Sequence, residues 1–177
     1  MTTRKISLTA MGIALFVVLA LCLQVPVFEN YYLCLGYVVV MVFCYYFGPV
    51  SGLITGSLGV VIYCLLINGL RGMPGWAAGN LIIGWMVGTV CKVTRHMQKI
   101  WLRNVLLVVT IVASVALGIL GVKSLVEVIL YAQPMALRMA KNIYAFTADV
   151  CILVFSLPIC ASLKPVVIKL FPEEALI

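Results

Sequence analysis

The residues in this chain that could do chemistry are polar side chains that interrupt long apolar runs. Asp149 follows Asn142 by seven residues, a spacing that places both on one face of a helix. Lys123 and Glu127 are four residues apart, the spacing of a helical ion pair. In apolar surroundings such groups either contact a ligand or join neighbouring helices. Both interpretations stay open for Asp149 and for the Lys123–Glu127 pair.

A second pattern lies in the stretch GWAAGNLIIGWMVG, where Trp76, Asn80, Gly84 and Gly88 follow one another at four-residue intervals. On a helix they form one stripe. Its polar end could face a cavity, and the glycines would let another helix come close. Trp76 could equally be an anchor at a membrane interface.

Catalytic signatures are missing from the sequence. It contains no H-E-x-x-H, no nucleophile elbow and no P-loop, and its single histidine, His96, lies in a basic segment. The seven cysteines form no C-x-x-C pair and are expected to act as small apolar side chains. We therefore predict that the chain is not an enzyme and holds no metal or cofactor.

The composition predicts the surroundings of these side chains. Of 177 residues, 65% are hydrophobic and 10% are charged, whereas soluble domains carry about 25% charged residues. A globule of this size could not hide so much apolar surface, so we predict one all-α integral membrane domain over 1–177. Six apolar segments are expected to span the bilayer, the second being short and the fifth long: 6–27, 33–47, 50–68, 76–91, 104–130 and 143–163.

The basic residues predict the orientation of the chain. With six spans both termini share a side, and that side collects most of the Lys and Arg residues: Arg4, Lys5, Lys92, Arg95, Lys99, Arg103, Lys164 and Lys169. The positive-inside rule then places both termini in the cytoplasm. The net charge of +7 is accounted for by these membrane-flanking positions rather than by nucleic-acid binding. The basic start and the apolar stretch after it are interpreted as a retained first span, because the stretch is too long for a signal peptide.

Three outer loops follow from this orientation, at 28–32, 69–75 and 131–142. They combine aromatic and hydrogen-bonding residues, which suits a small polar ligand with a flat or apolar part, although an aromatic membrane belt would also explain the tyrosines. The residues are Glu29, Asn30, Tyr31, Tyr32, Arg71, Tyr131, Gln133 and Arg138.

Small residues predict two close approaches between helices. Ala10 and Ala14 are four residues apart near the inner end of the first span, so that face could dock on a partner helix or pack within the chain. In FGPVSGLITGSLG, Gly48 and Pro49 predict a tight turn, and Gly52 and Gly56 are expected to seat the third helix against a neighbour.

Several stretches resemble the substrate-binding S components of energy-coupling factor (ECF) vitamin transporters. They are TRKISLTAMGIAL, YYFGPVSGLITGSLG, PGWAAGNLIIGWMVG and NIYAFTADVCILVFSLP, and the resemblance covers most of the chain. It implies an S-component-like bundle in a bacterial plasma membrane. It also implies two kinds of partner, a transmembrane T component and two ATPase subunits, with Ala10 and Ala14 docking on the T component. The chain itself would capture a vitamin at the outer face and release it inward.

The resemblance implies a binding region rather than a shared substrate motif. Mapped onto this sequence, the region holds these candidate substrate-binding residues: Glu29, Asn30, Tyr31, Arg71, Trp76, Asn80, Glu127, Arg138, Asn142 and Asp149. The outer cations would suit an anionic vitamin such as pantothenate or folate, but the outer acids weaken that argument. Riboflavin, pyridoxine-like compounds and cobalamin stay open. The alternative is a structural or assembly membrane protein without a transported ligand.

Overall fold

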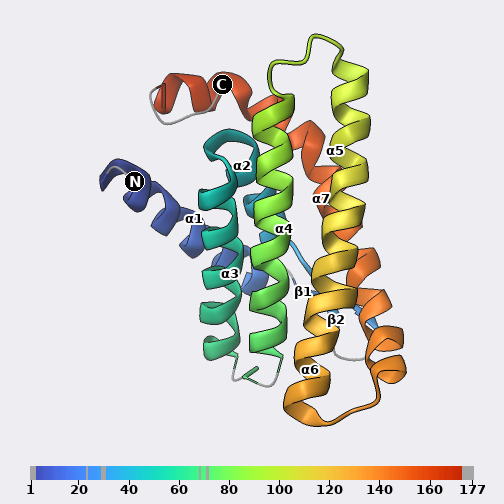
Figure 1. Ribbon diagram of the computed structural model, residues 1–177. Helices are drawn as coiled ribbons and strands as arrows, with labels where there is room; N and C mark the ends of the chain where they lie inside the picture. Colours follow the sequence, from blue (N-terminus) through green and yellow to red (C-terminus); the bar gives the residue numbers. More distant parts are fainter. Residues whose placement is uncertain (1–2, 23, 29–30, 68, 71, 173–177) are drawn as a thin grey trace.

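The computed structural model describes residues 3–22, 24–28, 31–67, 69–70 and 72–172, with side chains of 24–28, 31 and 32 left out of the description. Five of its helices are long and apolar enough to cross a membrane, and a shorter apolar helix, α2, accompanies them. The first residues of α1 and the last residues of α7 lie at the same end of the bundle (Figure 1). We call this the termini end and the opposite one the α6 end.

The first span is shorter than the sequence indicated. Helix α1 (Thr3–Cys22) is followed by an antiparallel hairpin of β1 (Gln24–Phe28) and β2 (Tyr31–Cys34), in which Val25 pairs with Leu33 and Pro26 with Tyr32. The expected helix over 6–27 is therefore wrong at 24–27, and a small two-stranded hairpin accompanies an otherwise all-α membrane fold. Pro26 disfavours a helical residue before it, and the valines and aromatics around it favour strands. The prediction of a helix rested on apolar composition alone, which does not distinguish a helix from a strand.

Helix α2 (Gly36–Phe47) turns directly into α3 (Pro49–Leu66) at Gly48. Gly48 has φ 87°, a conformation that glycine adopts without a side-chain clash. Pro49 starts α3, where its missing N–H has no helical partner to lose. The predicted Gly48–Pro49 turn is confirmed.

Glycines set the distance between α3 and its neighbours. A Cβ at Gly84 of α4 (Met73–Thr94) would come 2.5 Å from Leu53 Cα, and one at Gly88 would strike Pro49. A Cβ at Gly52 would strike Cys44 of α2. The predicted close approaches at Gly52, Gly84 and Gly88 are therefore present, and α3 packs against α1, α2 and α4. The one expected at Gly56 is absent, because a Cβ there would meet Val40 and Asn80 at ordinary contact distances of 3.4 and 3.6 Å.

The fifth span is one continuous helical path with a wide section in its middle. Helix α5 (Ile100–Val115) passes into a π-helical segment, η1 (Ala116–Lys123), and then into α6 (Ser124–Tyr131). Gly118 of η1 meets Gly79 of α4, so that a Cβ on either residue would lie 2.7 Å from the other's carbonyl oxygen. Segments of π-helix are frequent at functional sites, and this one ends at Lys123.

Helix α7 (Met135–Leu170) is much longer than the span predicted at 143–163. Only 132–134 separate it from α6, so the expected outer loop over 131–142 is wrong. Polar residues expected in that loop, such as Arg138, lie on the first turns of α7. The prediction failed because polar residues mark where a helix leaves the bilayer, and a helix can continue beyond that point. Pro158 and Pro165 lie inside α7, and its last turns run across the termini end (Figure 1).

Candidate functional site

Buried polar side chains gather at the α6 end, where the start of α4, η1, α6, the start of α7 and α2 meet. We call this set the polar cluster: Tyr37, Asn80, Lys123, Ser124, Glu127, Asn142 and Asp149, each less than 9% exposed. A protein seldom buries so many such groups unless they are paired or bind something.

One part of the polar cluster joins α2, α3 and α4. The Tyr37 hydroxyl donates to Asn80 Oδ1 at 2.8 Å and accepts from Trp76 Nε1 at 2.9 Å. Asn80 Nδ2 donates to the Gly56 carbonyl at 3.2 Å. The Trp76 ring also meets the Tyr63 ring edge to face, with centroids 5.8 Å apart. The result is a rigid aromatic and amide wall, with Trp76 itself only partly buried.

A second part joins α6 to α7. Asn142 Nδ2 donates to Ser124 Oγ at 2.9 Å and to Glu127 Oε2 at 3.3 Å. Arg138 approaches the same Glu127 oxygen at 3.5 Å, and its guanidinium lies 6.0 Å from the centre of the Tyr131 ring. Glu127 is thus held by an amide and a cation that come from successive turns of α7.

Asp149 and Lys123 connect these two parts. The Asp149 carboxyl lies within interaction range of the Tyr37 hydroxyl and of the Lys123 ammonium group. Lys123 in turn interacts with Glu127 as well as with Asp149. The two acids of the polar cluster therefore share one lysine, which stands at the end of η1.

The structure brings together every candidate residue whose side chain it describes: Trp76, Asn80, Glu127, Arg138, Asn142 and Asp149. Glu29, Asn30 and Arg71 lie outside the described residues, and for Tyr31 only its place in β2 is described. Asn142 and Asp149 do share a face of α7, but they contact different partners.

Three members of the polar cluster were absent from the predicted substrate-binding residues: Tyr37, Lys123 and Ser124. Lys123 was considered only as the ion-pair partner of Glu127. Tyr37 lies in an apolar run, and nothing in its neighbourhood in the sequence distinguishes it from an interfacial tyrosine. Ser124 directly follows Lys123 but was not considered. A search for every hydroxyl near the end of a predicted span would have found Tyr37 and Ser124, together with several that play no part here.

Ala10 and Ala14 lie on the exposed face of α1, beside Met11 and Leu15, which are 64% and 50% exposed. The opposite face carries Gly12 and Phe16, which pack against α2 and α3. Packing within the chain therefore does not explain the two alanines.

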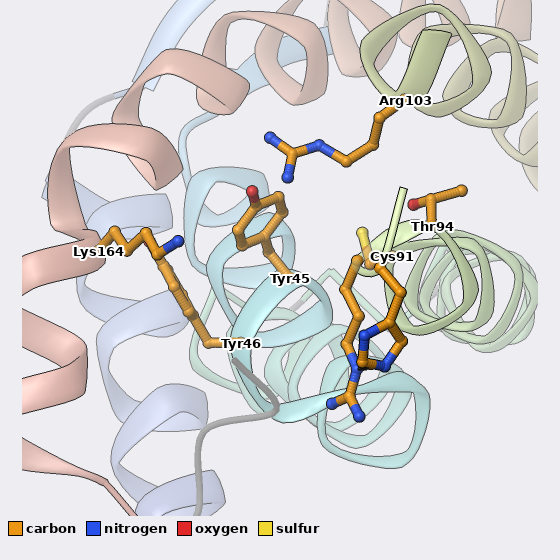
Figure 2. Close-up of a pocket in the computed structure, with 8 residues that line it drawn as sticks. Tyr45, Tyr46, Cys91, Thr94, Arg103 and Lys164 are labelled. Carbon is orange, nitrogen blue, oxygen red and sulfur yellow. Dashed lines mark hydrogen bonds between the residues drawn. The ribbon is translucent and has the colours of Figure 1, made fainter. Parts of the chain in front are cut away.

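A cavity of about 200 Å³ lies at the termini end, away from the polar cluster. Figure 2 shows Arg103 and Lys164 extending toward Tyr45 from different helices. The sequence analysis did not predict a site there.

Comparison with known protein families gives a match for this chain. Residues 1–165 match the model of a family described as ECF-type riboflavin transporter, S component. No curated protein matches the chain. The match covers more than half of the chain and agrees with the resemblance in the sequence and with the apolar helices of the fold. The chain therefore belongs to the family of ECF-type riboflavin transporter S components.

Proposed function

We propose that this chain is the riboflavin-binding subunit of an ECF-type importer and that the polar cluster is its vitamin site. The observation that carries the proposal is the cluster itself, a group of buried donors and acceptors beside aromatic rings at one end of the bundle. Family membership supports the assignment to vitamin transport.

The chemistry of riboflavin suits this set of groups. Its flat ring system can pack on aromatic faces such as those of Trp76 and Tyr63, and its ring edge and hydroxyl chain need both donors and acceptors. Asn142 and Lys123 are donors, and the Glu127 and Asp149 carboxylates are acceptors.

The charge balance of the site favours a neutral vitamin. Among the described residues at the site, Lys123 and Arg138 are basic, and Glu127 and Asp149 are acidic. A balanced set that is already paired offers no uncompensated cation to an anion such as pantothenate or folate. Riboflavin carries no net charge, so its binding leaves these pairs in balance.

Delivery of the vitamin would require a partner. We assign the exposed face of α1 around Ala10 and Ala14 as the surface that docks on the T component, because small side chains allow close helix contact. ATP hydrolysis would come from two ATPase subunits on other chains. In the proposed orientation, with the termini end cytoplasmic, the polar cluster faces the outside of a bacterial plasma membrane.

Purification from riboflavin-containing medium tests the proposal. The protein should retain a flavin, seen by its visible absorbance and by mass spectrometry, and the vitamin-free protein should bind riboflavin more tightly than pantothenate. Asn142→Leu removes the amide that holds Ser124 and Glu127 in place within the site. Because it also removes a donor and acceptor offered to the vitamin, riboflavin affinity should fall about 10- to 100-fold.

The matched control is Asn104→Leu, which changes the same residue type at an exposed position of α5. It should bind riboflavin like the unchanged protein. Absence of any flavin binding, or equal losses in the two variants, would contradict the proposed site.

A further inference from the structure

The cavity at the termini end is built from four helices. It is lined by two tyrosines of α2, the last turn of α4 with the residues after it, one arginine of α5 and one lysine of α7: Tyr45, Tyr46, Cys91, Thr94, Arg95, His96, Arg103 and Lys164. Its volume of about 200 Å³ is several times that of a single water molecule.

The lining is basic and carries no acidic side chain. Arg103 and Lys164 point toward the Tyr45 ring from two different helices (Figure 2), and the Arg103 guanidinium carbon lies 6.0 Å from the centre of that ring. Arg95 and His96 also line the cavity, and Arg95 Nε donates to His96 Nε2 at 2.9 Å. Arg103 and Lys164 thus approach one common space beside the Tyr45 ring (Figure 2).

Arg103, which lines the cavity, has a hydrogen-bond donor that no described acceptor contacts. Its Nε is buried and has no hydrogen-bond partner in the described structure, and a buried donor without an acceptor is costly. The Tyr46 hydroxyl, by contrast, donates to the Cys160 carbonyl, and Thr94 donates to the Val90 carbonyl at 2.7 Å. Arg103 is therefore a cation in the cavity lining that still needs a hydrogen-bond acceptor.

We propose that this cavity binds a phosphate group, held by Arg103 and Lys164. A guanidinium donates to phosphate oxygens in a fixed geometry, and a lysine adds a point charge. The phosphate could belong to an anionic phospholipid headgroup or to a free anion. Lys164 is an exposed residue of α7, so its ammonium group is accessible from outside the bundle. The site is separate from the polar cluster and does not depend on the vitamin.

The test measures lipid and anion binding by the purified full-length protein. Native mass spectrometry should show bound phosphatidylglycerol in preference to phosphatidylcholine. The Arg103→Gln and Lys164→Gln variants should each lower the apparent affinity for phosphatidylglycerol about tenfold or more, because each removes a charge-assisted hydrogen bond. Lys169→Gln is the matched control, since Lys169 is an exposed lysine of α7 outside the cavity lining, and it should bind like the unchanged protein.

A second arm separates the two sources of phosphate. The melting temperature is measured in detergent with sodium phosphate and with sodium chloride at equal ionic strength. Stabilisation by phosphate that disappears in Arg103→Gln shows that the free anion is sufficient. Binding of phosphatidylglycerol in the first arm without stabilisation by phosphate assigns the site to a lipid headgroup. The proposal is wrong if neither phosphate source binds, or if Lys169→Gln loses as much as Arg103→Gln. Riboflavin affinity is measured in parallel and should not change in these variants.

Discussion

Replacing Gly84 by alanine tests whether the α3–α4 contact is as close as the structure shows. The new Cβ would lie 2.5 Å from Leu53 Cα and 2.6 Å from its backbone nitrogen, whereas carbon atoms in contact are about 3.5–4.0 Å apart. Backbone atoms cannot turn aside like a side chain, so the helices would have to separate by about 1 Å. Such a separation would also weaken the close packing of Gly88 against Pro49 one turn further along α4.

The expected magnitude follows from two opposing effects. Overpacking of this kind costs about 1–3 kcal/mol, and the higher helix propensity of alanine offsets about 0.5–1 kcal/mol. Gly56 is the matched control, because its Cβ would meet Val40 and Asn80 at 3.4 and 3.6 Å, which is ordinary contact. Gly84→Ala should therefore be about 2 kcal/mol less stable than Gly56→Ala.

The assay is thermal unfolding of both variants in the same lipid nanodiscs. By the scaling known for soluble domains of this size, about 2 kcal/mol corresponds to a difference in melting temperature of roughly 4–8 °C. Riboflavin affinity, measured well below the unfolding transition, should stay close to that of the unchanged protein, since Gly84 lies outside the polar cluster. A Gly84→Ala variant as stable as Gly56→Ala would refute the close approach of α3 and α4.

Two further predictions concern the vitamin site and the proposed docking face. Riboflavin should quench tryptophan fluorescence mainly through Trp76; Trp76→Phe should remove most of the quenching, while Trp85→Phe, at a position 59% exposed on α4, should retain it. Ala10→Arg should abolish complex formation with the ECF module and vitamin uptake but leave riboflavin affinity within about twofold, because α1 supplies nothing to the polar cluster. Val105→Arg, on an exposed face of α5, should preserve the complex, and an intact complex in Ala10→Arg would refute the docking assignment.

Helix faces could be predicted from the sequence, because residues four or seven apart on one helix must lie on one side of it. This was sufficient for the glycine stripe of α4, for Asn142 beside Asp149, and for the small-residue face of α1. The family was indicated separately, by the resemblance of stretches such as YYFGPVSGLITGSLG to ECF S components. The spacing did not say which helix each face would meet.

The secondary structure was predicted less well wherever membrane and backbone preferences differ. Apolar residues at 24–27 extended the expected first helix into what is a hairpin, and polar residues at 135–142 were assigned to a loop although they are helical. Hydropathy indicates whether a segment prefers lipid or water. It does not choose between a helix and paired strands, because both satisfy the hydrogen bonds of the backbone N–H and C=O groups.

The sequence by itself determined that the chain enters a membrane, which side chains would be costly there, and which small residues would allow helices to touch. Only the tertiary structure decided that Tyr37 of α2 joins Trp76 and Asn80 of α4, and that Lys123 interacts electrostatically with two acids of different helices. It also decided that Arg103 and Lys164 share one cavity. The physical reason is that these groups lie far apart along the chain and meet only through the packing of several helices, which local spacing does not encode.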